Sequence, residues 1–146
     1  MKLAKALKEK NRLVKKIKDL QRDITRYNSI VSDSKREVDI PSLMEELENK
    51  VNELISLKTK IFEASRPIRE HIFRLSELKS KVLFLSGVDT TRGKVISRHM
   101  MSSDPVVDYD AVLTKTDVDS MVETTEGSID SIQEEIDTFN HTTEIE

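Results

Sequence analysis

The first long stretch of the chain, LAKALKEKNRLVKKIKDLQRDITRYNSIV at residues 3–31, contains neither proline nor glycine and decides the fold. Offsets of three and four residues place its apolar side chains on one side of an α-helix. They recur every seven positions in three rows: Leu3, Ile17, Ile24 and Val31; Ala6, Leu13, Leu20 and Tyr27; Leu7 and Val14. Three rows form a broader face than the two-row seam of a coiled-coil dimer, so we expect more than one partner for this helix.

Three more helices are predicted after this one. Pro41 suits the first turn of the second helix, and Pro67 disfavours a helical conformation just before it. Gly87 is a C-cap candidate for the third helix, and Thr116 or Asp117 is the expected N-cap of the last. The tail 140–146 has no helical period. The predicted helices therefore cover residues of about 2–31, 41–65, 67–87 and 116–139.

Between the third and the last helix the apolar period changes to two. Val95 and Ile96 begin one short β-type run, and residues 107–113 alternate apolar and polar side chains in another. Residues 102–105, Ser-Ser-Asp-Pro, form the predicted turn between them. A small β-hairpin over about 94–114 is therefore expected, and because a lone two-stranded ribbon is marginal in water, it must be covered by helices or by another subunit.

The predicted fold class is mainly α: a long antiparallel helical hairpin plus two further helices in a coiled-coil-like bundle, with a small β-hairpin. One elongated helical domain is expected over residues 1–146. The charged fraction of 35% suits such an assembly better than a globular enzyme, and the absence of cysteine excludes disulfides and thiolate chemistry. Lysines interrupt any leader-like apolar run near the start, and the longest apolar run is Val82 to Leu85, so a cytoplasmic location is expected.

The net charge of −3 conceals a strong polarity along the chain. Residues 1–31 carry ten Lys or Arg and three Asp or Glu, for +7, whereas residues 104–146 carry one and thirteen, for −12. Because opposite charges attract and both helices have an apolar stripe, we expect the last helix to pack against the first, within one chain or between subunits. Replacing a mid-stripe residue, Ile17 or Ile132, by Ala should cost about 2–5 kcal/mol.

Residues of catalytic or metal-binding types are scattered. His71, His99 and His141 lack metal-ligand spacing, and His71 falls at the rim of an apolar stripe. Asp104, Asp108, Asp110, Asp117 and Asp119 invite a calcium interpretation, but the required Gly and Glu positions are missing. We expect solvated side chains instead, and predict no catalytic, cofactor-binding or metal site, no cofactor and no small-molecule substrate.

Basic residues of the first helix could follow a phosphate backbone: Lys15, Lys16, Lys18, Arg22 and Arg26. The one nearby aromatic residue, Tyr27, lies on an apolar row, and the whole chain is acidic. Nucleic acid is therefore not an expected partner. No phosphate-binding glycine loop or nucleophile elbow is present, which argues against an enzyme.

Both ends of the chain resemble the septicolysin-like family of small helical bacterial proteins. The similar residues are Met1-Lys2-Leu3-Ala4-Lys5-Ala6-Leu7 at the start and, at the end, Ile132-Gln133-Glu134 followed by Asn140 and Thr142-Thr143-Glu144-Ile145. His141 stands where family members tend to have Trp, and residues 61–65 and 74–78 depart from the family pattern. The resemblance implies a helical protein with a small β element that self-associates, and the family name suggests a cytolysin.

The expected function is that of a non-enzymatic structural or interaction protein, a soluble homo-oligomer with an even number of subunits. The alternative is a membrane-active, cytolysin-like protein acting through amphipathic helices, since the first helix is basic and amphipathic. A metal- or nucleotide-dependent enzyme, the third hypothesis, rests only on the scattered Asp and His residues.

Overall fold

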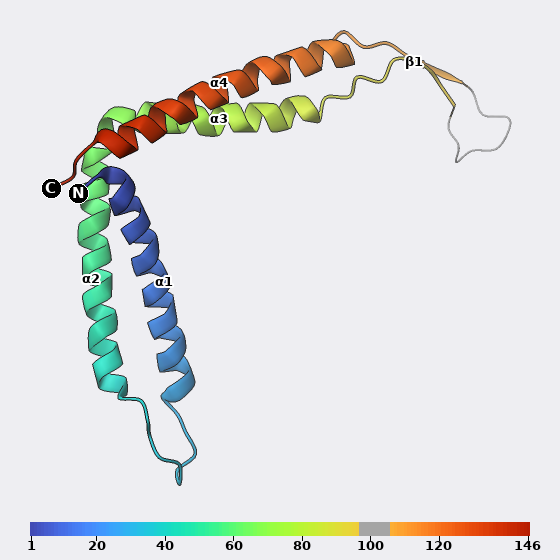
Figure 1. The fold of residues 1–146 in the computed structure, drawn as a ribbon. Helices are drawn as coiled ribbons and strands as arrows, with labels where there is room; N and C mark the ends of the chain where they lie inside the picture. Colours follow the sequence, from blue (N-terminus) through green and yellow to red (C-terminus); the bar gives the residue numbers. More distant parts are fainter. Residues whose placement is uncertain (97–105) are drawn as a thin grey trace. The chain divides into compact units, whose positions relative to one another are not determined.

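The computed structural model describes residues 1–96 and 106–146, and it shows a mainly helical protein with one small antiparallel sheet (Figure 1). Its elements are α1 (Leu3–Tyr27), α2 (Ile40–Ala64), the 3₁₀ turn η1 (Arg66–Ile68), α3 (Arg69–Ser86), β1 (Gly93–Val95), β2 (Val107–Tyr109) and α4 (Lys115–Thr142). They form two compact units: unit 1 comprises residues 1–69 and 136–146, and unit 2 comprises residues 70–135. That they act as one domain stays a prediction.

Helix α1 ends at Tyr27, four residues before the predicted Val31. The guanidinium of Arg36, in the loop that follows, donates from Nη1 to the carbonyl oxygens of Tyr27 (3.0 Å) and Asn28 (3.1 Å). These carbonyls have lost their helical donors, and a cationic side chain stabilises a helix C-terminus. The helix therefore stops where a long-range cap is available, although the apolar row continues.

Helix α2 begins where the proline predicted it would. Pro41 occupies the first turn, and Asp39 is the N-cap, accepting a hydrogen bond from the backbone N–H of Ser42 at 3.2 Å. Helices α1 and α2 lie side by side as a hairpin (Figure 1), which confirms this part of the predicted fold. Their pairing buries Leu13, Ile17 and Leu20 of α1.

The best-packed part of unit 1 lies where both chain ends meet the end of α2. Leu3, Ala6 and Ile145 form a buried cluster. Partly buried side chains from α1, α2 and the last turn of α4 pack around it: Leu7, Leu57, Ile61, Ala64 and Phe139. Apolar side chains from three segments that are distant in the sequence thus form one core.

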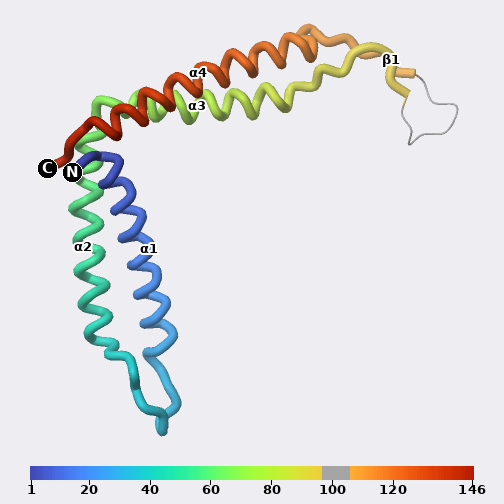
Figure 2. The backbone as a smooth tube through the Cα atoms, viewed as in Figure 1, coloured from blue at the N-terminus to red at the C-terminus, as the bar shows by residue number. Residues whose placement is uncertain are grey.

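The chain termini are joined by backbone hydrogen bonds as well as by packing, and Figure 2 shows them next to each other. Leu3 N–H donates to the Thr143 carbonyl at 2.8 Å, and Ile145 N–H donates to the Met1 carbonyl at 2.8 Å. The first of these bonds satisfies an orphan donor of α1, whose N-cap Lys2 offers no side-chain cap. Within the described residues of one chain, the last helix does not pack along the first as predicted: the two ends of the chain meet only through residues 139–145 and the first turn of α1.

The predicted third helix begins with a tighter turn. Residues 66–68 form η1, which contains Pro67 and buries Ile68. Arg69 Nη2 donates to the Phe62 carbonyl at 2.8 Å, and its guanidinium carbon lies 3.9 Å from the centre of the Phe62 ring. This contact covers part of an aromatic ring at the end of α2 that the helix packing leaves exposed.

In unit 2, α3 and α4 lie side by side (Figure 1). His71, near the start of α3, contacts Glu135 of α4. Helix α4 starts at Lys115, because Thr114 and Asp117 form a capping box. Asp117 N–H donates to Thr114 Oγ1 (3.2 Å), and Thr114 N–H donates to Asp117 Oδ2 (3.0 Å). Thr114, rather than the predicted Thr116 or Asp117, is therefore the N-cap.

The end of α4 also differs from the prediction, because residues 140–142 of the predicted tail are helical. Thr142 Oγ1 donates to the Thr138 carbonyl at 2.9 Å, and His141 Nδ1 lies 2.7 Å from the Asp137 carbonyl oxygen. These polar side chains bond to the carbonyls of the preceding turn and continue the helix without an apolar period.

Strands β1 and β2 form the predicted antiparallel ribbon, with Gly93 opposite Tyr109, Lys94 opposite Asp108 and Val95 opposite Val107. Gly93 has a φ of 85°, and Asp89 accepts hydrogen bonds from Thr91 in the turn before it. The second strand stops at Tyr109 instead of extending to residue 113. The predicted turn at 102–105 lies outside the described residues.

Candidate functional site

Unit 2 exposes an unusual number of large apolar side chains for its size. Its buried residues are Leu85, Val118 and the hydroxyl-bearing Thr125 in the part of the unit that the structure describes. Many more large apolar side chains of this unit are exposed. They come from α3, the ribbon, the segment before α4, and α4: Ile72, Phe73, Leu83, Phe84, Val95, Ile96, Val106, Val107, Tyr109, Val112, Leu113 and Met121. We call this set the apolar surface of unit 2.

The ribbon contributes one of the apolar faces. Side chains alternate between the faces of a strand, so Lys94 and Asp108 share one face, and Val95, Val107 and Tyr109 share the other. All three apolar side chains are between 41% and 46% exposed. The charged pair faces water favourably, but the apolar face has no cover within the described part of unit 2.

A groove between α3 and α4 has a volume of about 510 Å³. Arg74 and Leu78 of α3 line one side, and α4 lines the other with Ile132 and a row of small residues: Thr124, Gly127, Ser128 and Ser131. A Cβ atom placed on Gly127 would meet nothing within 4 Å. This open space excludes a close helix approach at Gly127 within the described structure.

Apolar side chains of α4 are less buried than the sequence predicts. Val118 and Ile136 are buried, and Thr125 fills a seam position with its hydroxyl donating to the Met121 carbonyl at 2.7 Å. Ile132 is only partly buried, because it lines the open groove. The expected cost of about 2–5 kcal/mol for Ile132→Ala is therefore too high for a single chain, whereas Ile17 is buried as predicted.

His71 lies at the rim of unit 2, with its Nε2 atom 2.7 Å from Glu135 Oε2. Its Nδ1 atom is buried and has no hydrogen-bond partner in the structure. The side chain as a whole is 40% exposed, so the pair is a surface contact between α3 and α4. His141 bonds within α4, and His99 lies outside the described residues.

The aspartates singled out by the sequence are separate rather than clustered. Asp108 and Asp110 are exposed in or next to the ribbon, Asp117 accepts a hydrogen bond from the Thr114 N–H at the start of α4, and Asp119 pairs with Lys115 at 3.0 Å. The hydrogen bonds from Thr114, first from its backbone and then from its side chain, lower the pKa of Asp117. Asp104 is outside the described residues. Within residues 1–96 and 106–146, no group of three or more His, Cys, Asp or Glu side chains could hold a metal ion.

The basic residues of α1 remain on its surface. Lys16 pairs with Glu46 of α2 at 3.3 Å, and Arg22 pairs with Asp19 at 3.1 Å. Arg26 lies over the Tyr27 ring at 5.3 Å, while Lys15 and Lys18 are exposed. Among the described helices, none is both long enough and apolar enough to cross a bilayer.

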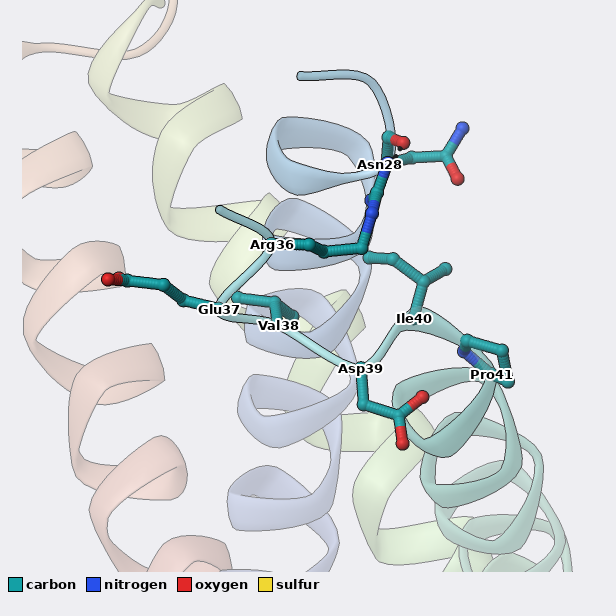
Figure 3. Close-up of a pocket in the computed structure, with 7 residues that line it drawn as sticks. All are labelled: Asn28, Arg36, Glu37, Val38, Asp39, Ile40 and Pro41. Atoms are coloured by element: carbon teal, nitrogen blue, oxygen red, sulfur yellow. Dashed lines mark hydrogen bonds between the residues drawn. The ribbon is translucent and has the colours of Figure 1, made fainter. Parts of the chain in front are cut away.

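A cleft of about 570 Å³ lies at the loop between α1 and α2 (Figure 3). The Arg36 side chain reaches toward Asn28, and Glu37 points away from it (Figure 3). Two of the three charged side chains that line the cleft bond to the backbone: Arg36 caps α1 and Asp39 caps α2. The roles of Arg36 and Asp39 at the cleft are therefore structural, and Glu37 points away from Asn28 (Figure 3).

Sequence reasoning missed the contact between the chain termini. Glu144 Oε2 lies 2.9 Å from the N-terminal ammonium, and Oε1 lies 2.8 Å from Lys2 Nζ. The hydrogen bond from Lys2, followed by that from the N-terminal ammonium, lowers the pKa of Glu144 to about 2. The signal available in the sequence was Ile145, a single apolar residue between two glutamates in a polar tail.

Comparison with protein-family models, with curated proteins and with solved structures finds no match to this chain.

Proposed function

We propose that this protein is a non-enzymatic structural or interaction protein that works as a homo-oligomer, with the apolar surface of unit 2 as its main contact. One observation carries the proposal: unit 2 exposes twelve large apolar side chains around a buried core of three residues in its described part. So many exposed large apolar side chains in one small unit favour an interaction surface, because an apolar surface of this extent gains free energy when a partner covers it. A second copy of the same protein can bury this apolar surface, and such a copy is available wherever the protein is made.

The isolated ribbon supports the same proposal. Two strands alone are marginally stable in water, and the apolar face of Val95, Val107 and Tyr109 needs a partner. Edge-to-edge pairing of two copies about a two-fold axis at Lys94 or Asp108 would place like charges opposite each other, which is destabilising. Packing of two ribbons through their apolar faces avoids this repulsion and buries the exposed side chains.

The test begins with the size of the wild-type protein, measured by light scattering at micromolar concentration. We expect an even number of subunits, because closed two-fold interfaces are the most common. The double variant Leu83→Ser with Phe84→Ser should dissociate the oligomer, since burial of each side chain contributes about 1.5–3 kcal/mol. Both residues are exposed, so the single chain should keep its helicity.

Ile55→Ser is the matched control, because Ile55 is an exposed apolar residue of α2 in unit 1. This variant should leave the oligomeric state unchanged. A wild-type protein that stays monomeric at micromolar concentration would contradict the proposal, as would an oligomer that survives the Leu83 and Phe84 substitutions.

The membrane-active alternative is the second candidate. It is favoured by the same exposed apolar side chains together with the cations of α1. The burial of the apolar face of α1 disfavours membrane activity. Leu13, Ile17 and Leu20 are buried in unit 1 and would reach a bilayer only after that unit opens. Leakage of anionic liposomes at micromolar protein would favour this candidate, and intact liposomes would favour the oligomer.

Membership of the septicolysin-like family is likewise a proposal, supported by the matching residues at the two ends. In the structure these residues are the ones that meet: Leu3 and Ala6 from the start pack against Ile145 from the end. A shared contact of this kind explains why both ends would be similar while the middle of the chain differs.

A further inference from the structure

The outer face of α1 carries a row of cations that we call the basic stripe. Its members follow one another at intervals of three, four or seven residues, so they lie on one side of the helix, where Asp19 fills the gap of seven and pairs with Arg22. All are exposed, on the side away from the buried Leu13 and Ile17: Lys5, Lys8, Arg12, Lys15, Arg22 and Arg26. At 1.5 Å per residue the stripe is about 32 Å long.

Helix α4 carries a matching row of anions, the acidic stripe, at intervals of three or four residues. All of its members are exposed: Asp119, Glu123, Glu126, Asp130 and Glu134. Asp119 pairs with Lys115, but within the described part of unit 2 the other four form no ion pair. The acidic stripe is about 22 Å long.

Each stripe repels a copy of itself and attracts the other. Two α1 helices cannot pack through their basic stripes, nor two α4 helices through their acidic stripes, without placing like charges side by side. A basic stripe by itself would suit any polyanion. This chain, however, also carries the acidic counterpart, and its net charge of −3 disfavours a polyanion as the partner of the whole molecule.

We infer that the basic stripe on α1 of one copy lies along the acidic stripe on α4 of a second copy. The inference rests on the proposed homo-oligomer, in which it specifies two surfaces that meet. Exposed ion pairs are individually weak, so the stripes select and orient the partner, while the apolar surface of unit 2 supplies the stability. A two-fold axis forms the same contact twice in one dimer, since each copy then offers both stripes.

Charge reversal tests this contact directly. The basic-stripe variant is Lys8→Glu with Lys15→Glu, and the acidic-stripe variant is Glu123→Lys with Asp130→Lys. Each variant alone sets two reversed charges in one stripe against the unchanged stripe of its partner, so its dissociation constant for self-association should rise about tenfold or more. An equimolar mixture should recover assembly, with the two variants in equal numbers in every complex. Native mass spectrometry measures both the size and the composition.

Lys58→Glu with Lys60→Glu is the matched control, because both lysines are exposed on α2 and lie outside the stripes and outside unit 2. This variant should assemble like the wild type. Added salt should weaken wild-type assembly, since charges in water are screened beyond about 8 Å at physiological ionic strength. Far-UV circular dichroism verifies that every variant keeps its helicity.

Four outcomes would overturn the inference. Unchanged assembly of both variants would show that the stripes do not meet. Recovery in a chain with all four substitutions, but not in the mixture, would show that they meet within one chain. Loss of binding to anionic vesicles by the basic-stripe variant, with unchanged assembly, would assign that stripe to a membrane. A monomeric wild type would also remove the proposed function, whereas the first three outcomes leave the homo-oligomer intact.

Discussion

At the scale of single residues, several charged side chains bind specific backbone groups or join the two chain termini. Arg36 ends α1 by donating to two carbonyls, and Asp39 begins α2 by accepting from an N–H. Glu144 holds both the N-terminal ammonium and the Lys2 ammonium within 3 Å of its carboxylate. These contacts are made by exposed groups, so their effect depends on pH and on salt.

The Glu144 contact gives unit 1 a specific acid sensitivity. The pKa of Glu144 falls from an ordinary value of 4.5 to about 2 in the folded protein. As the pH is lowered, the Glu144 carboxylate is therefore protonated in the unfolded chain before it is protonated in the folded protein. The stabilisation is therefore complete above pH 4.5 and is lost as the pH falls through about 2. Urea unfolding of the wild type and of Glu144→Gln should differ at pH 6, and the difference should vanish near pH 2.

Glu146→Gln is the control for this experiment, because the exposed Glu146 side chain forms no ion pair with the described residues. Its stability should follow that of the wild type at both pH values. A Glu144→Gln effect of equal size at pH 6 and pH 2 would mean that the carboxylate charge is not what joins the termini.

At the scale of elements, the start of α4 is set by the reciprocal hydrogen bonds of Thr114 and Asp117. Thr114→Ala removes the side-chain acceptor for an N–H in the first turn and should cost about 0.5–2 kcal/mol of unfolding free energy. Because α4 forms one side of unit 2, amide exchange in its first turn should also accelerate. Chemical denaturation and hydrogen exchange measure the two effects.

Thr116→Ala is the control, because it removes a threonine that is not the N-cap. The exposed Thr116 was an N-cap candidate by sequence but lies inside the helix. We expect this variant to be close to neutral. A larger loss of stability from Thr116→Ala than from Thr114→Ala would contradict the observed cap.

At the scale of the whole molecule, the two ends of the chain close the core of unit 1. Ile145, the second-to-last residue, is 7% exposed and packs with Leu3 and Ala6. Ile145→Ala should therefore cost about 2–5 kcal/mol, as expected for a fully packed residue and not for a frayed terminus. Thermal unfolding of the variant should begin at a lower temperature than that of the wild type.

Ile96→Ala provides the comparison, because Ile96 is 70% exposed and its truncation removes little packing within one chain. Measured at a concentration that keeps the protein monomeric, this variant should unfold like the wild type. Equal stability of the wild type and Ile145→Ala would show that the tail does not belong to the core.

The sequence by itself determined the helices, the ribbon and their order, because the period of apolar residues and the positions of Pro41 and Gly87 act locally. It also contained both charged stripes, which need only helical spacing. The tertiary structure decided where α1 stops, since Arg36 reaches its carbonyls only after the loop folds back. It also decided that Ile145 is core, that Ile132 is not, and that unit 2 is largely uncovered. These outcomes depend on contacts between segments far apart in the chain, and apolar periodicity cannot show which partner, if any, covers a face.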